Sequence, residues 1–227
     1  NNIIQSLQTD SGYDPMARAM SLLNGAGYDR ITATGYGRHL FELAFDAPTV
    51  TEIRAYAVGA RYFLPDVKTV LDIGGQDSKA IALNGDGKVV RFEMNDRCAA
   101  GTGKFLEIMA HTLGYDLDSF GVEALKATGD ININSLCTVF AESEVTSLLA
   151  KGAPRQDIAL GLHHSVVRRA AGMMKRVSDE EPILFAGGVA KNPCIHKLLE
   201  QTLGHKITVP ENPQMIGALG AALLAAM

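Results

Sequence analysis

The sequence predicts an α/β protein with a mixed β-sheet. Two apolar segments, LDIGG at 71–75 and LFAGG at 184–188, end in glycine pairs and lead into further elements. Strands that end in glycine turns and feed helices are typical of a layered α/β architecture. Between them, NGDG at 84–87 joins two strand-like segments. Asn-Gly and Asp-Gly pairs supply the positive φ angles of a tight hairpin, which indicates a mixed rather than an all-parallel sheet.

The other elements are expected in chain order. The first 23 residues predict a strand end, a turn and a helix, and the segment from Asp29 predicts a strand up to Thr34. Apolar spacing through Ile53, Ala57 and Ala60 predicts a helix. Further helices are expected at 102–113, 138–150 and 155–177, followed by two strand–helix units that begin at PILFAGG and KITV. We find no linker, repeat or low-complexity segment.

Composition excludes several classes of protein. The chain has 227 residues, of which 47% are hydrophobic, and its mean hydropathy is +0.07. No apolar run approaches the roughly 18–20 residues of a membrane span, and no secretory signal pattern opens the chain, so we expect a cytoplasmic protein without a membrane partner. A net charge of −4 gives no reason to expect nucleic acid. Three cysteines argue against a disulfide framework.

The two glycine turns are candidates for contact with a nucleotide. Asp72 ends a buried strand before Gly74 and Gly75. Glycine lets the backbone approach a ligand, and the carboxylate could hold Mg²⁺ through water. An ordinary β-turn with a surface Asp explains this one motif equally well. Because Gly187 and Gly188 repeat the design after another strand, the pair favours a nucleotide cleft.

The segment NDRCAAGTGKFLE at 95–107 looks like the end of a P-loop but does not fit one. The P-loop pattern would need glycine at Cys98 and Ser or Thr at Phe105. The dinucleotide pattern G-x-G-x-x-G also fails, because Leu106 stands in place of its third glycine. Cys98, rather than the GTGK turn, is therefore the candidate functional residue of this segment.

Two cysteines stand at helix starts. Cys98 comes before the turn that opens one helix, and Cys137 precedes another. The partial positive charge of a helix N-terminus lowers a thiol pKa. A cubane iron–sulfur cluster needs four thiolates, and a symmetric dimer would supply two from each chain. Cys194 follows Pro193 and is expected to be structural.

Several long motifs resemble one family of proteins. LDIGGQDSKAI, MNDRCAAGTGKFLE, CTVFAESEV, FAGGVAKNP and PQMIGALGAALLA occur in this order, with ATGYGR and VTEIRAYAVGA upstream. Together they resemble the ATP-dependent activators of 2-hydroxyacyl-CoA dehydratases, whose family includes the ATPase subunits of benzoyl-CoA reductases (BadF/BadG/BcrA/BcrD-type ATPases). The resemblance implies an acetate-and-sugar-kinase/Hsp70/actin-like (ribonuclease H-like) fold, with two α/β lobes closing on ATP.

The resemblance also implies the site residues. One [4Fe–4S] cluster would lie between the subunits of a homodimer, ligated by Cys98 and Cys137 of each chain. ATP or ADP with Mg²⁺ would lie between the lobes, with Asp72 and Gln76 in catalytic roles. The implied nucleotide-binding residues are Gly74, Gly75, Gln76, Asp77, Gly187, Gly188, Asn192 and Gln214. Lobe I would comprise residues 1–66 and 214–227, in part, and lobe II residues 67–213.

The implied activity is ATP hydrolysis coupled to electron transfer. An upstream donor such as ferredoxin or flavodoxin would reduce the cluster, and the protein would pass a low-potential electron to a partner acyl-CoA dehydratase or reductase. Three other interpretations stay open: a benzoyl-CoA reductase subunit, a small-molecule kinase without a cluster, and a scaffold protein. The family's N-terminal phosphate hairpin, similar to G-I-D-x-G-S, is absent from this sequence. A protein without it is expected to bind nucleotide weakly and to hydrolyse little.

Overall fold

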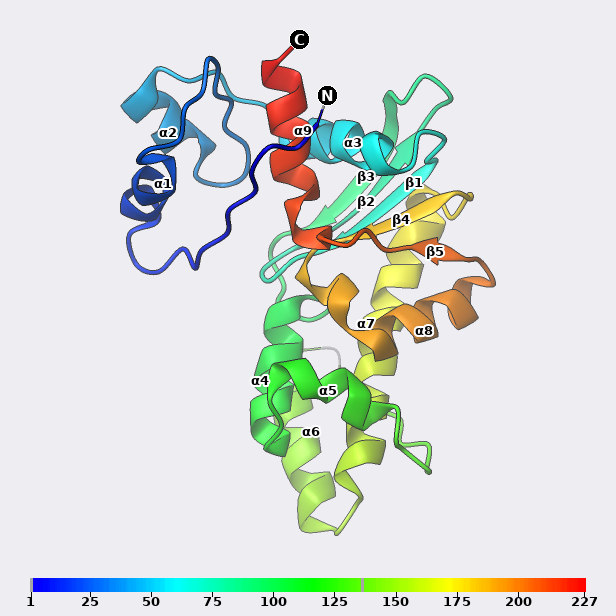
Figure 1. The fold of residues 1–227 in the computed structure, drawn as a ribbon. Helices are drawn as coiled ribbons and strands as arrows, with labels where there is room; N and C mark the ends of the chain where they lie inside the picture. The colour runs from blue at the N-terminus through cyan, green and yellow to red at the C-terminus, as the bar shows by residue number, and fades with distance from the viewer. Residues whose placement is uncertain (1, 136) are drawn as a thin grey trace.

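A five-stranded mixed sheet forms the centre of the protein (Figure 1), whose computed structural model describes residues 2–135 and 137–227. The strand order is β3-β2-β1-β4-β5, with β1 antiparallel to β2 and parallel to β4. The strands are β1 (Thr69–Ile73), β2 (Ser78–Leu83), β3 (Val89–Asn95), β4 (Ile183–Ala186) and β5 (Ile207–Thr208). The predicted mixed sheet is thus confirmed.

The β2–β3 hairpin forms at the NGDG segment, as its composition predicts. Gly87 has a φ of +75°, and the Asn84 side-chain oxygen accepts hydrogen bonds from the backbone N–H groups of Asp86 and Lys88. Asn and Gly favour such turns because they tolerate this backbone and bond it locally. The hairpin makes β2 the inner and β3 the outer strand at this edge of the sheet.

Helices cover both faces of the sheet. Helix α3 (Glu52–Phe63) and helix α9 (Ile216–Ala225) pack on one face, where their apolar residues share a core with Val70, Ile81 and Leu184. Helix α7 (Arg155–Val177) lies against the other face, where the larger core includes Leu71 and Phe185. Since side chains alternate across a strand, β1 contributes Val70 to one core and Leu71 to the other.

A helical region extends away from the sheet (Figure 1). It contains α4, α5 and α6, and α7 runs from it back to the sheet. Helix α8 packs against α7, and the short 3₁₀ helices η1 and η2 contact β4. Their bounds are α4 (Gly103–Leu113), α5 (Leu117–Ala124), α6 (Thr138–Ala150), η1 (Gly188–Lys191), α8 (Pro193–Leu203) and η2 (Pro213–Met215). The helices predicted at 138–150 and 155–177 are confirmed, and α4 begins one residue after its predicted start.

The N-terminal part differs from expectation. Residues 2–14 contain no strand, and helices α1 (Pro15–Leu23) and α2 (Arg38–Phe45) have no buried residue. The strand predicted up to Thr34 was wrong, because Ala33 makes only an isolated bridge to Thr49. Two short strands without a third rarely form a stable sheet. The proposed division into lobes stays a prediction, although α3 and α9 share a core with the sheet.

Within the two described ranges, no helix combines the length and the apolar character that a membrane span requires.

Candidate functional site

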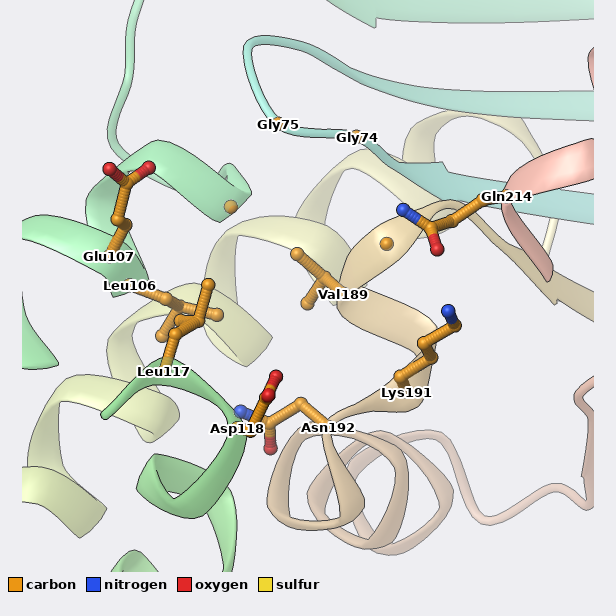
Figure 2. Close-up of a pocket in the computed structure, with 12 residues that line it drawn as sticks. Gly74, Gly75, Leu106, Glu107, Leu117, Asp118, Val189, Lys191, Asn192 and Gln214 are labelled. Carbon is orange, nitrogen blue, oxygen red and sulfur yellow. The ribbon is translucent and has the colours of Figure 1, made fainter. Parts of the chain in front are cut away.

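Five separate chain segments line one pocket of about 370 Å³. Figure 2 shows Gly74 and Gly75 of the β1–β2 turn on one side, with Asp118 and Asn192 on the opposite side. The wall is completed by the start of α4, by η1 and by Gln214 of η2. Five residues predicted to bind nucleotide therefore lie together: Gly74, Gly75, Gly188, Asn192 and Gln214.

The GTGK turn closes against the glycine turn. The backbone N–H of Gly103 donates to Gly74 O at 2.8 Å, and that of Lys104 donates to Gly75 O at 2.8 Å. A Cβ at position 103 would lie 3.1 Å from Gly74 O, so glycine permits this close approach. These first N–H groups of α4 are satisfied within the protein, which agrees with the rejection of GTGK as a phosphate cradle.

The second glycine turn joins β4 to η1. Gly187 has a φ of +87°, and its N–H donates to Pro213 O at 2.8 Å. A Cβ there would lie 2.3 Å from Ile73 O and 2.7 Å from Asp72 Oδ1. The position therefore needs glycine for both conformation and space. Gly188 follows in the pocket, where a Cβ would approach the Gln214 amide to 3.3 Å.

A buried ionic cluster lies behind the β1–β2 turn. Lys79 Nζ lies 2.7 Å from Asp77 Oδ2, 3.1 Å from Asp72 Oδ2 and 3.7 Å from Glu52 Oε1. Both Lys79 and Asp72 are 1% exposed. Burial lowers the pKa of Lys79, but the Asp72, Asp77 and Glu52 carboxylates outweigh this effect and raise its pKa overall. The lysine therefore stays charged and holds the carboxylates together.

The pKa of Asp72 is higher than that of a surface carboxyl group. Burial raises its pKa to about 6, against the opposing effects of the Lys79 ammonium and the Tyr56 hydroxyl. Its second oxygen, Oδ1, is buried and has no hydrogen-bond partner within residues 2–135 and 137–227. Because a buried carboxylate oxygen is costly to leave unsatisfied, this atom is a candidate acceptor for a ligand or a hydrated cation.

The remaining predicted residues lie outside the pocket lining: Asp72, Gln76, Asp77 and Gly187. Gln76 is exposed at the tip of the turn, and Asp77 is buried and paired with Lys79. Gly187 lies behind Gly188, between β1 and η2. The motif Asp72–Asp77 thus divides into glycines that face the pocket and carboxylates that face the buried cation.

Sequence reasoning missed Lys79 and His163. Lys79 lies two residues before Ile81 on β2 and therefore shares its face, which belongs to the core beneath α3, so a period of two could have placed the lysine on a buried face. His163 stands in no motif of the sequence that would mark it. In the structure it is buried and contacts Asn192 in the pocket wall.

The two candidate cluster ligands are exposed thiols. Cys98 lies in the loop before α4, where Asn95 Nδ2 donates to its carbonyl at 2.8 Å, and Cys137 is the N-cap of α6. Exposed thiols, Cys137 at the start of α6 and Cys98 in the loop before α4, are chemically suited to bind iron at the protein surface. Cys194 is buried, and burial raises its pKa to about 12, as expected for a structural thiol. Within residues 2–135 and 137–227, no three metal-ligating side chains gather.

Solved structures share the fold over nearly the whole chain. Component A of the (R)-2-hydroxyglutaryl-CoA dehydratase of Acidaminococcus fermentans is 41% identical, with a TM-score of 0.87 over 95% of this chain and 85% of that one. The activator of the 2-hydroxyisocaproyl-CoA dehydratase of Clostridium difficile, solved with bound ADPNP, is 37% identical, with a TM-score of 0.85 over 98% and 83%. The α/β fold is thus the actin-like ATPase fold that the motifs predicted.

Curated proteins of known sequence are similar to this chain over most of its length. The activator of lactoyl-CoA dehydratase of Anaerotignum propionicum is 46% identical over 85% of this chain and 74% of its own length. One of the benzoyl-CoA reductase subunits of Thauera aromatica is 33% identical over 88% and 72%. The profile of the BadF/BadG/BcrA/BcrD ATPase family matches residues 13–225. With this match and these identities, the chain belongs to the BadF/BadG/BcrA/BcrD ATPase family.

Proposed function

We propose that this chain binds ATP in the pocket and delivers a low-potential electron to a partner 2-hydroxyacyl-CoA dehydratase. One observation carries the proposal: five residues expected at the nucleotide come from separate segments and line a single pocket. Relatives named as dehydratase activators, at 40–46% identity, support the same activity.

The two ends of the pocket suit different parts of a nucleotide. Gly74 and Gly75 leave one side open to phosphates, since neither carries a side chain. Asp72 would hold Mg²⁺ through water, and its free Oδ1 is the acceptor that this role needs. The η1–α8 segment with Asn192, together with α5, would face the nucleoside. Gln214 would close over the ligand from η2, and exposed Gln76 could reach the phosphates from the tip of the turn.

Cys98 and Cys137 would hold half of a [4Fe–4S] cluster, with the other half held by a second copy in a homodimer. Two exposed thiols per chain match this share of four ligands. The cluster would supply one-electron chemistry at low potential. A small donor such as ferredoxin or flavodoxin would provide the electron.

Helix α4 offers a physical link between the pocket and Cys98. Its first two N–H groups bind the carbonyls of Gly74 and Gly75, and Cys98 lies five residues before its first residue. A shift of the glycine turn on nucleotide binding would therefore displace the start of α4 and the adjoining loop. ATP can drive such a shift only through different affinities for the two arrangements.

A benzoyl-CoA reductase subunit is the second candidate, since one such protein is 33% identical. The named dehydratase activators are more similar, at 40–46% identity, and favour the first candidate. A small-molecule kinase gives the exposed cysteines no role.

A crossed set of variants tests both halves of the proposal. Cys98→Ser and Cys137→Ser should lose bound iron and keep the wild-type affinity for ADP, because the thiols lie outside the pocket lining. Gln214→Ala should keep its iron and weaken ADP binding about threefold to tenfold, the effect of one lost hydrogen bond. Iron after anaerobic purification and ADP affinity by calorimetry are the two measurements.

Two controls accompany these variants. Cys194→Ala removes the buried thiol, and Gln201→Ala removes an exposed glutamine of α8; both should keep iron and ADP affinity. Full iron content in Cys98→Ser would contradict the assignment of Cys98 as a cluster ligand. An unchanged ADP affinity in Gln214→Ala would contradict the assignment of the pocket as the nucleotide site.

A further inference from the structure

His163 is a buried polar side chain in the middle of α7. It is fully buried, and its Nδ1 lies 2.7 Å from the backbone carbonyl oxygen of Ala159. A carbonyl can only accept, so Nδ1 must carry the hydrogen. Burial lowers the pKa of His163 to about 4, which leaves the ring neutral at ordinary pH. In this tautomer Nε2 has a lone pair and no hydrogen.

Nε2 points at an amide of the pocket wall. Asn192 Nδ2 lies 3.0 Å from His163 Nε2. Because Nε2 can only accept in this tautomer, the amide must turn its nitrogen toward the ring. The histidine therefore fixes which end of the Asn192 amide is the donor and which is the acceptor.

The amide oxygen of Asn192 is held on its other side by α8. Asn192 Oδ1 accepts from the backbone N–H groups of Cys194 and Ile195 at 3.0 and 3.1 Å and so caps this helix. Asn192 also ends η1, so one residue fixes the junction between two elements that line the pocket. A flipped amide would lose the cap and the bond to His163 together.

Helix α5 packs against both His163 and Asn192. A Cβ at Gly121 would lie 2.4 Å from Asn192 Oδ1, so glycine allows α5 to approach the amide. The ring of Phe120 lies 4.6 Å from the ring of His163. The neighbouring α5 residues Leu117 and Asp118 line the pocket, so His163 and Asn192 support two of its walls.

We propose that His163 is a positioning residue for the nucleotide pocket, in which its Nδ1–H tautomer orients the Asn192 amide and thereby sets the junction of η1, α8 and α5. The proposal rests on the proposed nucleotide site. His163 acts through Asn192 and does not itself line the pocket.

Two substitutions separate positioning from packing. In His163→Gln, the side-chain oxygen can stand where Nε2 stood and still accept from Asn192. In His163→Asn, the shorter side chain can reach only the Nδ1 position, so the acceptor is lost. Both remove the ring beside Phe120 and should lower the melting temperature by similar amounts. We expect His163→Asn to weaken ADP binding about fivefold to tenfold and His163→Gln to stay within about threefold of wild type.

Nitrogen-15 NMR provides a readout that needs no nucleotide. Wild type should show His163 protonated at Nδ1 alone, and the backbone amide signals of Cys194 and Ile195 should shift in His163→Asn much more than in His163→Gln. Equal loss of ADP affinity in both variants, or a hydrogen on Nε2, would overturn the proposal. If wild type binds no ADP, the proposed nucleotide site fails, while the NMR signals still decide whether His163 orients Asn192.

Discussion

At the scale of single residues, Lys79 governs the electrostatics of the β1–β2 turn. Its ammonium group is buried among the carboxylates of Asp72, Asp77 and Glu52. Charged groups are rarely buried without a partner, because desolvation is costly. Here one cation compensates three acidic groups, two of them in the motif expected at the phosphates. The carboxylates are thereby held in place before any ligand binds.

Removing this cation should destabilise the protein strongly. Lys79→Met leaves the carboxylates buried without compensation and should lower the free energy of unfolding by about 3–5 kcal/mol. Adding Asp72→Asn should recover part of this loss, since one uncompensated charge is then absent. Urea unfolding of the single and double variants measures both effects.

An exposed pair provides the control for Lys79. Lys126 pairs with Glu123 on the surface, so Lys126→Met should change the free energy of unfolding by less than about 1 kcal/mol. If Lys79→Met were as mild as Lys126→Met, the cluster would contribute little to stability.

The role of a residue could be predicted from the sequence only where a motif or a backbone constraint marks that residue. Gly74, Gly75 and Gly188 were predicted because glycine has few reasons to follow a buried strand other than a turn or a close approach. The roles of Lys79 and His163 depend on partners far away in sequence, such as Glu52 and Asn192. No local pattern contains those contacts.

At the scale of elements, the crossing of α3 and α9 fixes one face of the sheet. A Cβ at Gly220 would lie 1.7 Å from Ala55 O, and one at Gly59 would lie 2.1 Å from Ile216 O. The two backbones therefore approach closely at reciprocal glycines. This contact ties the C-terminal helix to α3, from which Glu52 reaches the buried cluster.

Alanine substitutions at two helical glycines, one inside the α3–α9 crossing and one outside it, should change the free energy of unfolding in opposite directions. Gly220→Ala should lower the free energy of unfolding by about 3 kcal/mol, because the new methyl group has no room. Gly172 in α7 meets nothing closer than 3.7 Å, so Gly172→Ala should raise it by about 0.5–1 kcal/mol through reduced chain entropy. Urea or thermal unfolding compares the pair, and equal effects would contradict the close crossing.

Element prediction succeeded for the two longest helices. The bounds of α6 and α7 match the prediction, and the 23 residues of α7 bury one side of the helix in the core. Helices α2 and α5 were not predicted, because each has only 8 residues and α5 contains Gly121. The predicted strand up to Thr34 does not form, because the isolated bridge from Ala33 to Thr49 is all that its surroundings provide.

At the scale of the whole molecule, the sheet and the helical region meet at the pocket. The glycine turns come from the sheet, whereas α4 and α5 come from the region that extends beyond it (Figure 1). The loop with Cys98 and the start of α6 with Cys137 are exposed on the surface. Both thiols were predicted at helix starts, which holds for Cys137, whereas Cys98 lies five residues before α4. A shared site depends on a second chain, which one sequence does not describe.

The most direct test of the central claim is the iron and sulfide content of the anaerobically purified wild-type protein, measured together with its mass in solution. We expect a dimer with about two irons per chain, lost on exposure to air, since four thiolates from two chains would hold one four-iron cluster. A protein without iron after anaerobic handling and attempted reconstitution would contradict this expectation. Cys98 and Cys137 would then be ordinary thiols, and the kinase interpretation would take precedence.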